Sequence, residues 1–241
     1  MIFYFAVAIA AIAAGGIASI AGFGIGSILT PLVAMQYGMK TAVAAVSIPH
    51  VIATVVRFWK LRAHVNRTIF LQFGLMNAAG ALIGAVIHFY VTNPVLGVVL
   101  GVLLVFVGLM GVLGYTENLR FGRKGSWIAG AVSGGFGGLV GNQGGIRSAA
   151  MLGLGVKGPA FVATATAIGL AVDAVRIPVY LASEWRRMVA TWPVVLAAVL
   201  GVLVGTLIGE RVLRWIPEKL FRKVVSAILL VIGILLLVFQ E

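Results

Sequence analysis

The sequence has no cysteine and few charged side chains. Cysteine is absent from all 241 residues, which excludes disulfides and chemistry that depends on a thiolate. Only 10% of the residues are charged, against about 25% in ordinary soluble domains. Acids are the scarcest, since 6 stand against 18 Lys and Arg, and they are too scattered for the paired carboxylates of acid–base catalysis. These absences argue against a soluble enzyme.

Apolar residues dominate what is present, at 61% of the chain. A globular core could not bury this much apolar surface, so the expected solvent is lipid. The net charge of +12 comes from short basic clusters between apolar runs, as on the cytoplasmic side of membrane proteins. Aromatic and basic residues do not interleave as in a nucleic-acid groove, so we expect no nucleic-acid partner. No set of metal ligands, catalytic triad or phosphate loop stands out, so we expect no enzyme and no bound cofactor or metal.

Three apolar segments are too short to cross a membrane. A spanning helix needs about 20 residues, whereas 27–38, 126–140 and 146–155 fall short and flank the stretches AGFGIGS and GNQGG. Two short helices around a glycine break predict a re-entrant hairpin or a discontinuous helix, covered by protein or by a water-filled cavity. The sequence does not decide whether segment 2–21 is one helix or two. Six further segments are expected to span fully: 41–59, 68–91, 95–115, 159–182, 189–209 and 224–239.

The chain repeats itself at a shift of 119 residues. Gly22 falls on Gly141, and each half continues with two further long apolar segments. We therefore predict a first repeat at 1–116 and a second at 126–241, joined by a cytoplasmic linker at 117–125. The other coincidences place Gly15, Gly16, Gly26, Val43, Ala44, Val56 and Arg57 on Gly134, Gly135, Gly145, Val162, Ala163, Val175 and Arg176.

Three basic clusters set the expected topology. Placing all three in the cytoplasm satisfies the positive-inside rule, and each half then crosses the membrane an odd number of times. The predicted fold is an all-α, polytopic inner-membrane protein with both termini outside. It has two inverted repeats, each a glycine-rich broken or re-entrant hairpin plus about three full transmembrane helices, which is typical of secondary transporters. The clusters are Arg57, Lys60, Arg62 and Arg67; Arg120, Arg123 and Lys124; and Arg211, Arg214, Lys219, Arg222 and Lys223.

The stretch GNQGGIRS puts polar groups in the second break. Free N–H groups at the start of its second half-helix favour an anion. Arg147 adds a fork of donors that suits an oxyanion, and Asn142 and Gln143 can hydrogen-bond the oxygens. An intramembrane Arg is costly and indicates function by default. The alternative is structural: the amides cap the broken helix ends and Arg147 snorkels to an interface.

The first break, GGIASIAGFGIGSILTP, is a counterpart without a cation. It would close the site from the other half with backbone N–H groups and the hydroxyls of Ser27 and Thr30. The predicted substrate-binding set joins both breaks: Asn142, Gln143, Arg147 and Ser148 with Gly22, Gly24, Gly26, Ser27, Gly141, Gly144 and Gly145.

Polar residues form a stripe on each helix that follows a break. The first stripe is spaced by 3, 4 and 3 residues, as one helical face requires, and the repeat gives it a counterpart. Asp173, the only Asp, can pair with Arg176 one turn away. Asp173 is either a structural partner of Arg176 or, if transport is coupled to a proton, the residue that carries the proton. Arg57 is expected at an interface, because further basic residues follow it. The stripes consist of Ser47, His50, Thr54 and Arg57, and of Thr166, Asp173 and Arg176.

Three other polar residues leave alternatives open. His50 and His88 titrate near neutral pH, so each is either a proton carrier or a satisfied polar side chain. Asn77 lies among small residues in segment 68–91. It either packs against a neighbouring helix or reaches the pathway.

Two stretches carry a resemblance to a known family: AGFGIGSILTPLVAMQYGMKTAVAAVS and GNQGGIRSAAMLGLGVKGPAFVATAT. Each is a glycine-rich hairpin that opens one half and leads into a helix of small residues with Ser or Thr. Over nearly the whole chain the sequence resembles the sulfite exporter TauE/SafE family. The resemblance implies a secondary transporter of sulfite, organosulfonates or related small anions. The chain departs from the common pattern at Asn142, Gln143, Arg147 and Ser148, where the family often shows glycines, apolar residues and a proline.

We therefore expect an exporter of a small oxyanion, sulfite or a small organosulfonate, that works by alternating access with its site between the repeats. Its partners are this anion and the lipid bilayer, and proton coupling is an open question. An anion channel and a non-transporting membrane subunit are the alternatives.

Overall fold

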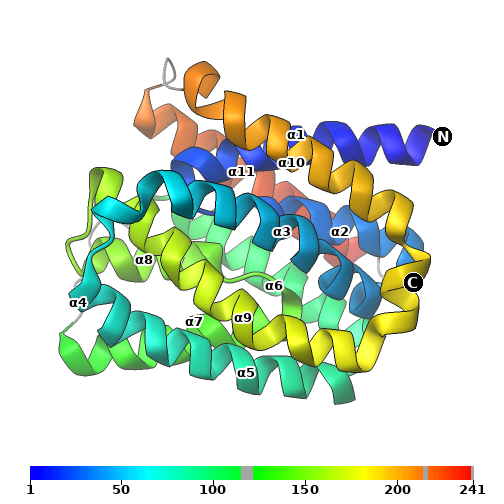
Figure 1. The fold of residues 1–241 in the computed structure, drawn as a ribbon, viewed down its shortest axis with the longest axis horizontal. Coiled ribbons are helices and arrows are strands. Elements are labelled where there is room, and N and C mark those ends of the chain that lie inside the picture. The colour runs from blue at the N-terminus through cyan, green and yellow to red at the C-terminus, as the bar shows by residue number, and fades with distance from the viewer. Residues whose placement is uncertain (115–121, 214–216, 240–241) are drawn as a thin grey trace.

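The computed structural model describes residues 1–114, 122–213 and 217–239, and every regular element in these ranges is a helix. The predicted all-helical class is confirmed. The helices run roughly along the long axis of the molecule (Figure 1). In chain order they are α1 (Ile2–Ala21), α2 (Ile25–Tyr37), α3 (Met39–Leu61), η1 (Arg62–His64), α4 (Arg67–Ile69), η2 (Phe70–Gly74), α5 (Leu75–Tyr90), α6 (Asn93–Val112), α7 (Arg123–Val140), α8 (Gly144–Gly153), α9 (Gly158–Ala190), α10 (Trp192–Leu213) and α11 (Glu218–Val238).

Within the described ranges, seven helical stretches are long and apolar enough to cross a membrane. The six predicted spans are among them, and the seventh is α1, which forms one unbroken helix of 20 residues. Helix α9 is longer than the sequence indicated, with 33 residues. The connection expected at 183–188 therefore lies inside a helix, and Glu184 is buried there.

Two glycines in the left-handed conformation end the helices that open each half. Gly22 follows α1 with φ 74°, and Gly141 follows α7 with φ 71°. A residue with a Cβ is strained at such a φ, so glycine suits both positions. The helices that follow, α2 and α8, have only 13 and 10 residues. The chain is therefore broken at both glycine-rich stretches.

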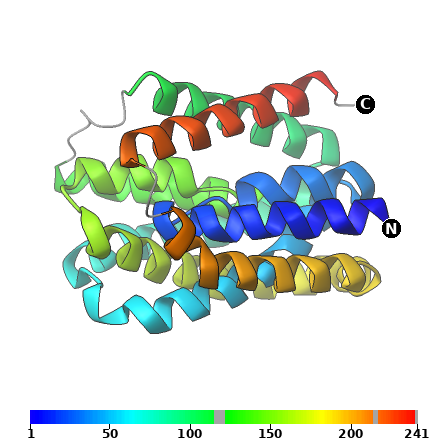
Figure 2. The ribbon, with the colours of Figure 1, turned by 90° about the horizontal axis from the view of Figure 1, so that it is seen from above.

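Close packing of small residues joins the helices in pairs. Helix α1 lies against α10, α5 against α7, and α6 against α11. Figure 2 shows α1 beside α10 and α6 beside α11. A Cβ added at Gly205 would overlap the carbonyl oxygen of Ile12, and one added at Gly84 would overlap that of Gly135. Lipid supplies no hydrophobic force between helices, so such close backbone approach is a main source of their association.

Gly205→Val is expected to loosen the α1–α10 pair. Overpacking costs about 1–3 kcal/mol, which lowers the midpoint of thermal unfolding in detergent by several degrees. The matched control is Gly122→Ala, because a Cβ at Gly122 meets nothing within 4 Å. Equal midpoints for the two variants would contradict the packing argument.

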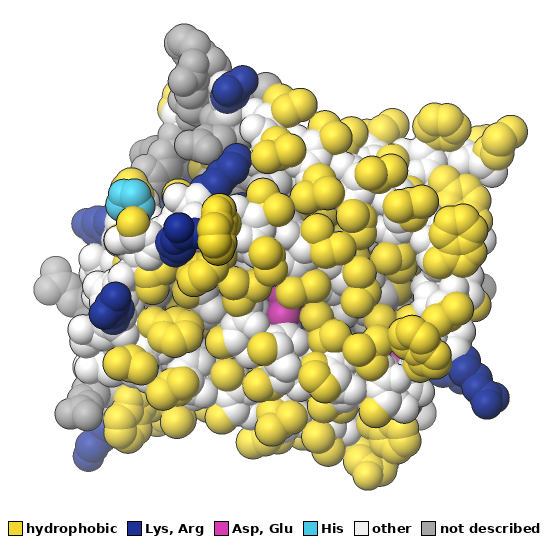
Figure 3. Space-filling model, viewed as in Figure 1, with side chains coloured by type: hydrophobic (Ala, Val, Ile, Leu, Met, Phe, Trp, Pro, Cys, Tyr) yellow, Lys and Arg dark blue, Asp and Glu magenta, His cyan; other side chains and the backbone are white. Residues whose placement is uncertain are grey.

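The outer surface suits a bilayer. Large apolar side chains cover most of the face in Figure 3, and the visible Lys and Arg side chains gather mainly toward one end. Both chain termini lie at the opposite end (Figure 1). Trp59 is 70% exposed near the basic end, and the Arg62 guanidinium stacks on its ring at 3.9 Å. Such an amphipathic pair is typical of a membrane–water interface.

Candidate functional site

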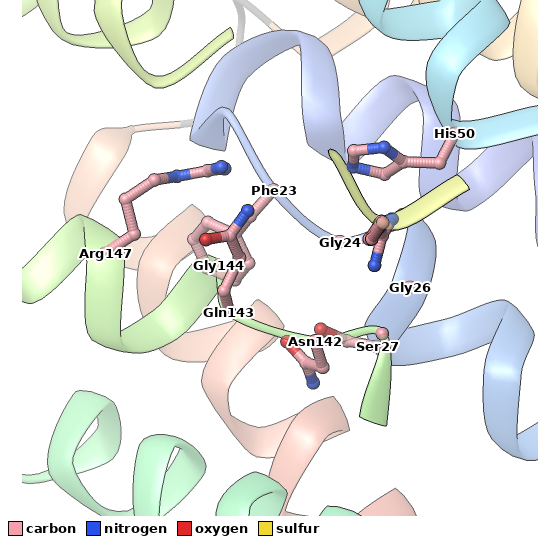
Figure 4. A pocket seen from close by; sticks show the side chains of 11 residues that line it. Phe23, Gly24, Gly26, Ser27, His50, Asn142, Gln143, Gly144 and Arg147 are labelled. Carbon is pink, nitrogen blue, oxygen red and sulfur yellow. The ribbon is translucent and has the colours of Figure 1, made fainter. Parts of the chain in front are cut away.

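A small polar cavity lies where the two helix breaks meet (Figure 4). Its volume is about 20 Å³ for the centre of a water molecule, slightly more than the roughly 10–15 Å³ that one water needs. Residues from both halves surround it. The lining consists of Phe23, Gly24, Gly26 and Ser27, of Gly141, Asn142, Gln143, Gly144 and Arg147, and of His50 and Arg176 from α3 and α9.

The two breaks touch through glycines. A Cβ added at Gly26 would overlap the carbonyl oxygen of Gly141, and one added at Gly144 would overlap the side chain of Phe23. Any larger residue at either glycine would push the breaks apart. Phe23 is a lining residue that the sequence did not suggest, because an apolar side chain in an apolar chain carries no signal.

Arg147 is buried, with 2% of its surface exposed. Its Nη2 donates to the carbonyl oxygen of Gly22 at 2.7 Å, so a side chain of α8 binds the end of α1. Nε and Nη1 have no hydrogen-bond partner among the described residues. The guanidinium does not reach an interface, as the structural alternative required, and it keeps unused donors in the protein interior.

The amides beside Arg147 are buried as well. Gln143 precedes α8 but makes no capping hydrogen bond with its side chain, and its Oε1 has no partner. Asn142 is 6% exposed and lines the cavity. In Figure 4 the Gln143 side chain lies on the Arg147 side of the cavity, while Asn142 lies beside Ser27. The first N–H groups of α8, which no helix can pair internally, belong to the same break.

An ion-pair network on α3 and α9 borders the cavity. Asp173 has no exposed surface, and its Oδ1 accepts from Nε and Nη2 of Arg176 at 2.9 and 2.8 Å. Its Oδ2 lies 2.7 Å from Nδ1 of His50, which belongs to the facing helix. His50 and Arg176 both line the cavity. The two polar stripes therefore meet at Asp173, next to the breaks.

Arg57 is buried, with 4% exposure, and does not lie at an interface as expected. Its Nη2 donates to Oγ1 of Thr54 at 3.1 Å, while Nε and Nη1 have no partner. Helix α3 continues for another turn past Arg57, which keeps the guanidinium inside the bundle. Arg57 and Arg176, together with Arg147, are close enough to act on one another electrostatically, and Asp173 is the one carboxylate among them. Among the described residues around the cavity, positive charges therefore outnumber negative ones.

Three side chains hold the end of α7 in place. The carbonyls of Gly137, Gly138 and Leu139 would be unpaired in an isolated helix. They accept hydrogen bonds from Nη1 of Arg176 at 2.7 Å, from the Tyr180 hydroxyl, and from Nδ1 of His88 at 2.7 Å. His88 is thus a partner of the α7 end and does not line the cavity. The sequence could not show this, because the three donors come from α9 and α5.

The other predicted residues lie outside the cavity lining. The hydroxyls of Ser47, Thr54 and Thr166 bond to carbonyls of their own helices, at 2.6, 2.6 and 2.7 Å. Asn77 donates to the Gly130 carbonyl at 3.1 Å in the α5–α7 contact, which is the packing alternative. Gly22 contributes the carbonyl that Arg147 binds. The remaining residues outside the lining are Thr30, Gly145 and Ser148.

The described residues contain no group of three or more His, Cys, Asp or Glu that could hold a metal ion. A lipid-compatible helical bundle with broken helices around a buried, positively charged cavity defines a multi-pass membrane protein with an internal polar site.

Comparison with known families agrees with this class. The family described as "Sulfite exporter TauE/SafE" matches residues 7–236, so the chain belongs to that family of membrane transporters. The resemblance drawn from the two glycine-rich stretches is confirmed. Searches of curated proteins and of solved structures gave no match.

Proposed function

We propose that the protein is a secondary transporter that exports a small oxyanion, sulfite or a small organosulfonate, from the cell. The observation that carries this proposal is the buried cavity between the breaks, with the unpaired donors of Arg147 beside it. A buried Arg retains a high cost unless an anion satisfies its donors. The unpaired Nε and Nη1 are donors for the oxygens of a sulfite or sulfonate group.

The other groups of the cavity suit the same ligand. Gln143 and Asn142 supply amide N–H donors, Ser27 a hydroxyl, and the start of α8 backbone N–H groups. The positive excess around Arg147 favours an anion over a neutral solute. Gly24 and Gly144 allow the backbone to approach the ligand closely.

Alternating access needs two similar halves that rock about the site. The proposed repeats are 1–116 and 126–241, joined by a linker at 117–125 of which residues up to 121 lie outside the described ranges. The matching left-handed glycines support this division. So does the packing: α1 of the first half lies against α10 of the second, and α7 of the second against α5 of the first.

The directions of the hairpins support an inverted arrangement. In Figure 1 the α1–α2 hairpin opens toward the end that holds both termini, and the α7–α8 hairpin opens toward the opposite, basic end. We assign the basic end to the cytoplasm of an inner-membrane protein by the positive-inside rule, with both termini outside. The membrane potential then drives net negative charge outward, by about 2.3 kcal/mol per charge and 100 mV, so an anion that carries a proton with it is driven by one charge fewer.

The size of the cavity favours a transporter over a channel. A space for about one water does not hold a sulfite ion or form a continuous pore. The breaks must separate for the anion to enter, which is the movement that alternating access requires. If a proton is coupled to this movement, the titratable groups next to the breaks are the candidates.

The test is flux of radiolabelled sulfite into proteoliposomes that contain the purified protein. Sulfate, methanesulfonate and acetate are added as competitors, and protein-free liposomes give the background. We expect saturable flux above background that methanesulfonate or sulfate inhibits. Flux of a different anion with no sulfite flux would keep the transporter and change its substrate. Background flux for every anion would favour the non-transporting subunit.

A further inference from the structure

We infer that His50 is the site that binds a proton together with the anion, so that transport couples the two. This inference rests on the proposed function and names its coupling residue. It starts from the hydrogen bond between Nδ1 of His50 and Oδ2 of Asp173, at 2.7 Å. A carboxylate only accepts hydrogen bonds, so Nδ1 carries the hydrogen. In the neutral ring Nε2 then holds a free lone pair.

The surroundings of Asp173 keep the carboxylate charged and oriented. Arg176 binds its other oxygen through two nitrogens, and the carboxylate has no exposed surface. Because Asp173 also pairs with Arg176, its single negative charge is shared between Arg176 and His50. His50 is therefore held in one tautomer and one orientation by a neighbour that need not move, as in the His–carboxylate pairs of proton-transferring sites.

The free nitrogen of His50 belongs to a ring that borders the cavity. The His50 side chain is 15% exposed and lines the cavity, and among the described residues its one hydrogen-bond partner is Asp173. A Cβ added at Gly169 would lie 3.8 Å from Cε1 of His50 and 3.5 Å from Nη1 of Arg147. His50 and the unpaired guanidinium donors thus face the same small space.

The charges around His50 explain why proton and anion bind together. From α9 it faces Asp173 and Arg176, from its own helix Arg57, and from α8 Arg147. With three cations against one carboxylate, these side chains carry a net positive charge while the cavity lacks an anion. An anion on Arg147 compensates that excess and adds an acceptor for a second N–H of His50. By reciprocity, a protonated His50 strengthens anion binding by the same factor.

The other two histidines do not both bond to a carboxylate and line the cavity. His88 is buried against the carbonyl of Leu139 and does not line the cavity. His64 is exposed on η1 at the basic end. The chain has only these 3 histidines, so a spectrum of labelled histidine rings contains signals from three rings.

Nitrogen NMR of protein labelled in its histidine rings tests the inference directly. At a fixed pH near 7, we expect saturating sulfite to convert His50 from one protonated ring nitrogen to two, while His64 is unchanged. His50→Asn assigns the signal, and its side-chain amide keeps a donor near the Nδ1 position for Asp173. A His50 ring that stays singly protonated with sulfite bound would overturn the inference.

Transport supplies the second measurement. With the membrane potential clamped at zero, one coupled proton lets a gradient of one pH unit accumulate the anion about tenfold. In His50→Asn, a pH gradient is expected to accumulate less sulfite than in the wild type. Sulfite–sulfite exchange is expected to be slower, because the anion loses a hydrogen-bond donor, but to stay above the protein-free background. Protons bound to sulfite itself contribute equally to accumulation in every variant. The difference in accumulation between His50→Asn and both the wild type and the matched control His64→Asn therefore measures the contribution of His50. Exchange together with undiminished accumulation in His50→Asn would overturn the inference. Absence of sulfite exchange in the wild type would instead overturn the proposed substrate, and the inference with it.

Discussion

Arg147→Ala is expected to reduce sulfite flux by one to two orders of magnitude. A hydrogen bond to a charged group contributes about 1.5–3 kcal/mol, and the fork of Arg147 offers at least one such bond to the anion. Arg147→Lys is expected to retain partial flux, because an ammonium keeps the charge but loses the planar fork. Initial rates of radiolabelled sulfite uptake measure both effects, and Arg186→Ala, at an exposed position, is the control.

Loss of flux in Arg147→Ala has a second explanation, since Arg147 also binds the end of α1 through the Gly22 carbonyl. Gln143→Leu separates loss of anion binding from loss of structure. The Oε1 of Gln143 has no partner among the described residues, and its side chain caps no helix. We expect this variant to unfold at the wild-type temperature and to lose about tenfold in flux. Wild-type flux in both Gln143→Leu and Arg147→Lys would show that the anion binds elsewhere.

The sequence predicted the parts of the fold that depend on local composition. Runs of apolar residues located the spanning helices, and the glycines around positions 22 and 141 located the breaks. Helix α9 extended beyond its predicted end because Glu184 pairs with Arg187 one turn later, which lets charged residues continue a helix. Periodicity and hydropathy cannot register such a pair.

The candidate site was partly predictable from local composition as well. Arg147, Asn142 and Gln143 stand out because polar residues are rare in this chain, and the structure brings all three to one cavity. The bond from Arg147 to Gly22 joins residues 125 positions apart, and that from His50 to Asp173 joins residues 123 apart. The repeat suggested that these helices face each other, but only the packed structure shows which atoms meet.

Asp173→Asn is expected to have the largest effect on stability. The substitution keeps the shape of the side chain but leaves the buried Arg176 without its opposite charge, while His50 loses a charged acceptor. Removing one partner of a buried ion pair costs about 3–5 kcal/mol. For a chain of this size that lowers the midpoint of thermal unfolding by about 6 °C or more. Unfolding of the purified protein in detergent measures the shift.

The double variant Asp173→Asn/Arg176→Met tests whether the unpaired charge causes the loss. Methionine fills the space of the Arg stem without a charge, so the double variant is expected to be more stable than Asp173→Asn alone. Glu184→Gln is the matched control, since this carboxylate pairs on the same helix with Arg187, which is 65% exposed. A pair with one exposed partner contributes about 1 kcal/mol or less, so its loss changes the midpoint little. If the single variant were as stable as Glu184→Gln, Asp173 would be free to change its charge, and His50 would lack the fixed carboxylate on which its proposed role depends.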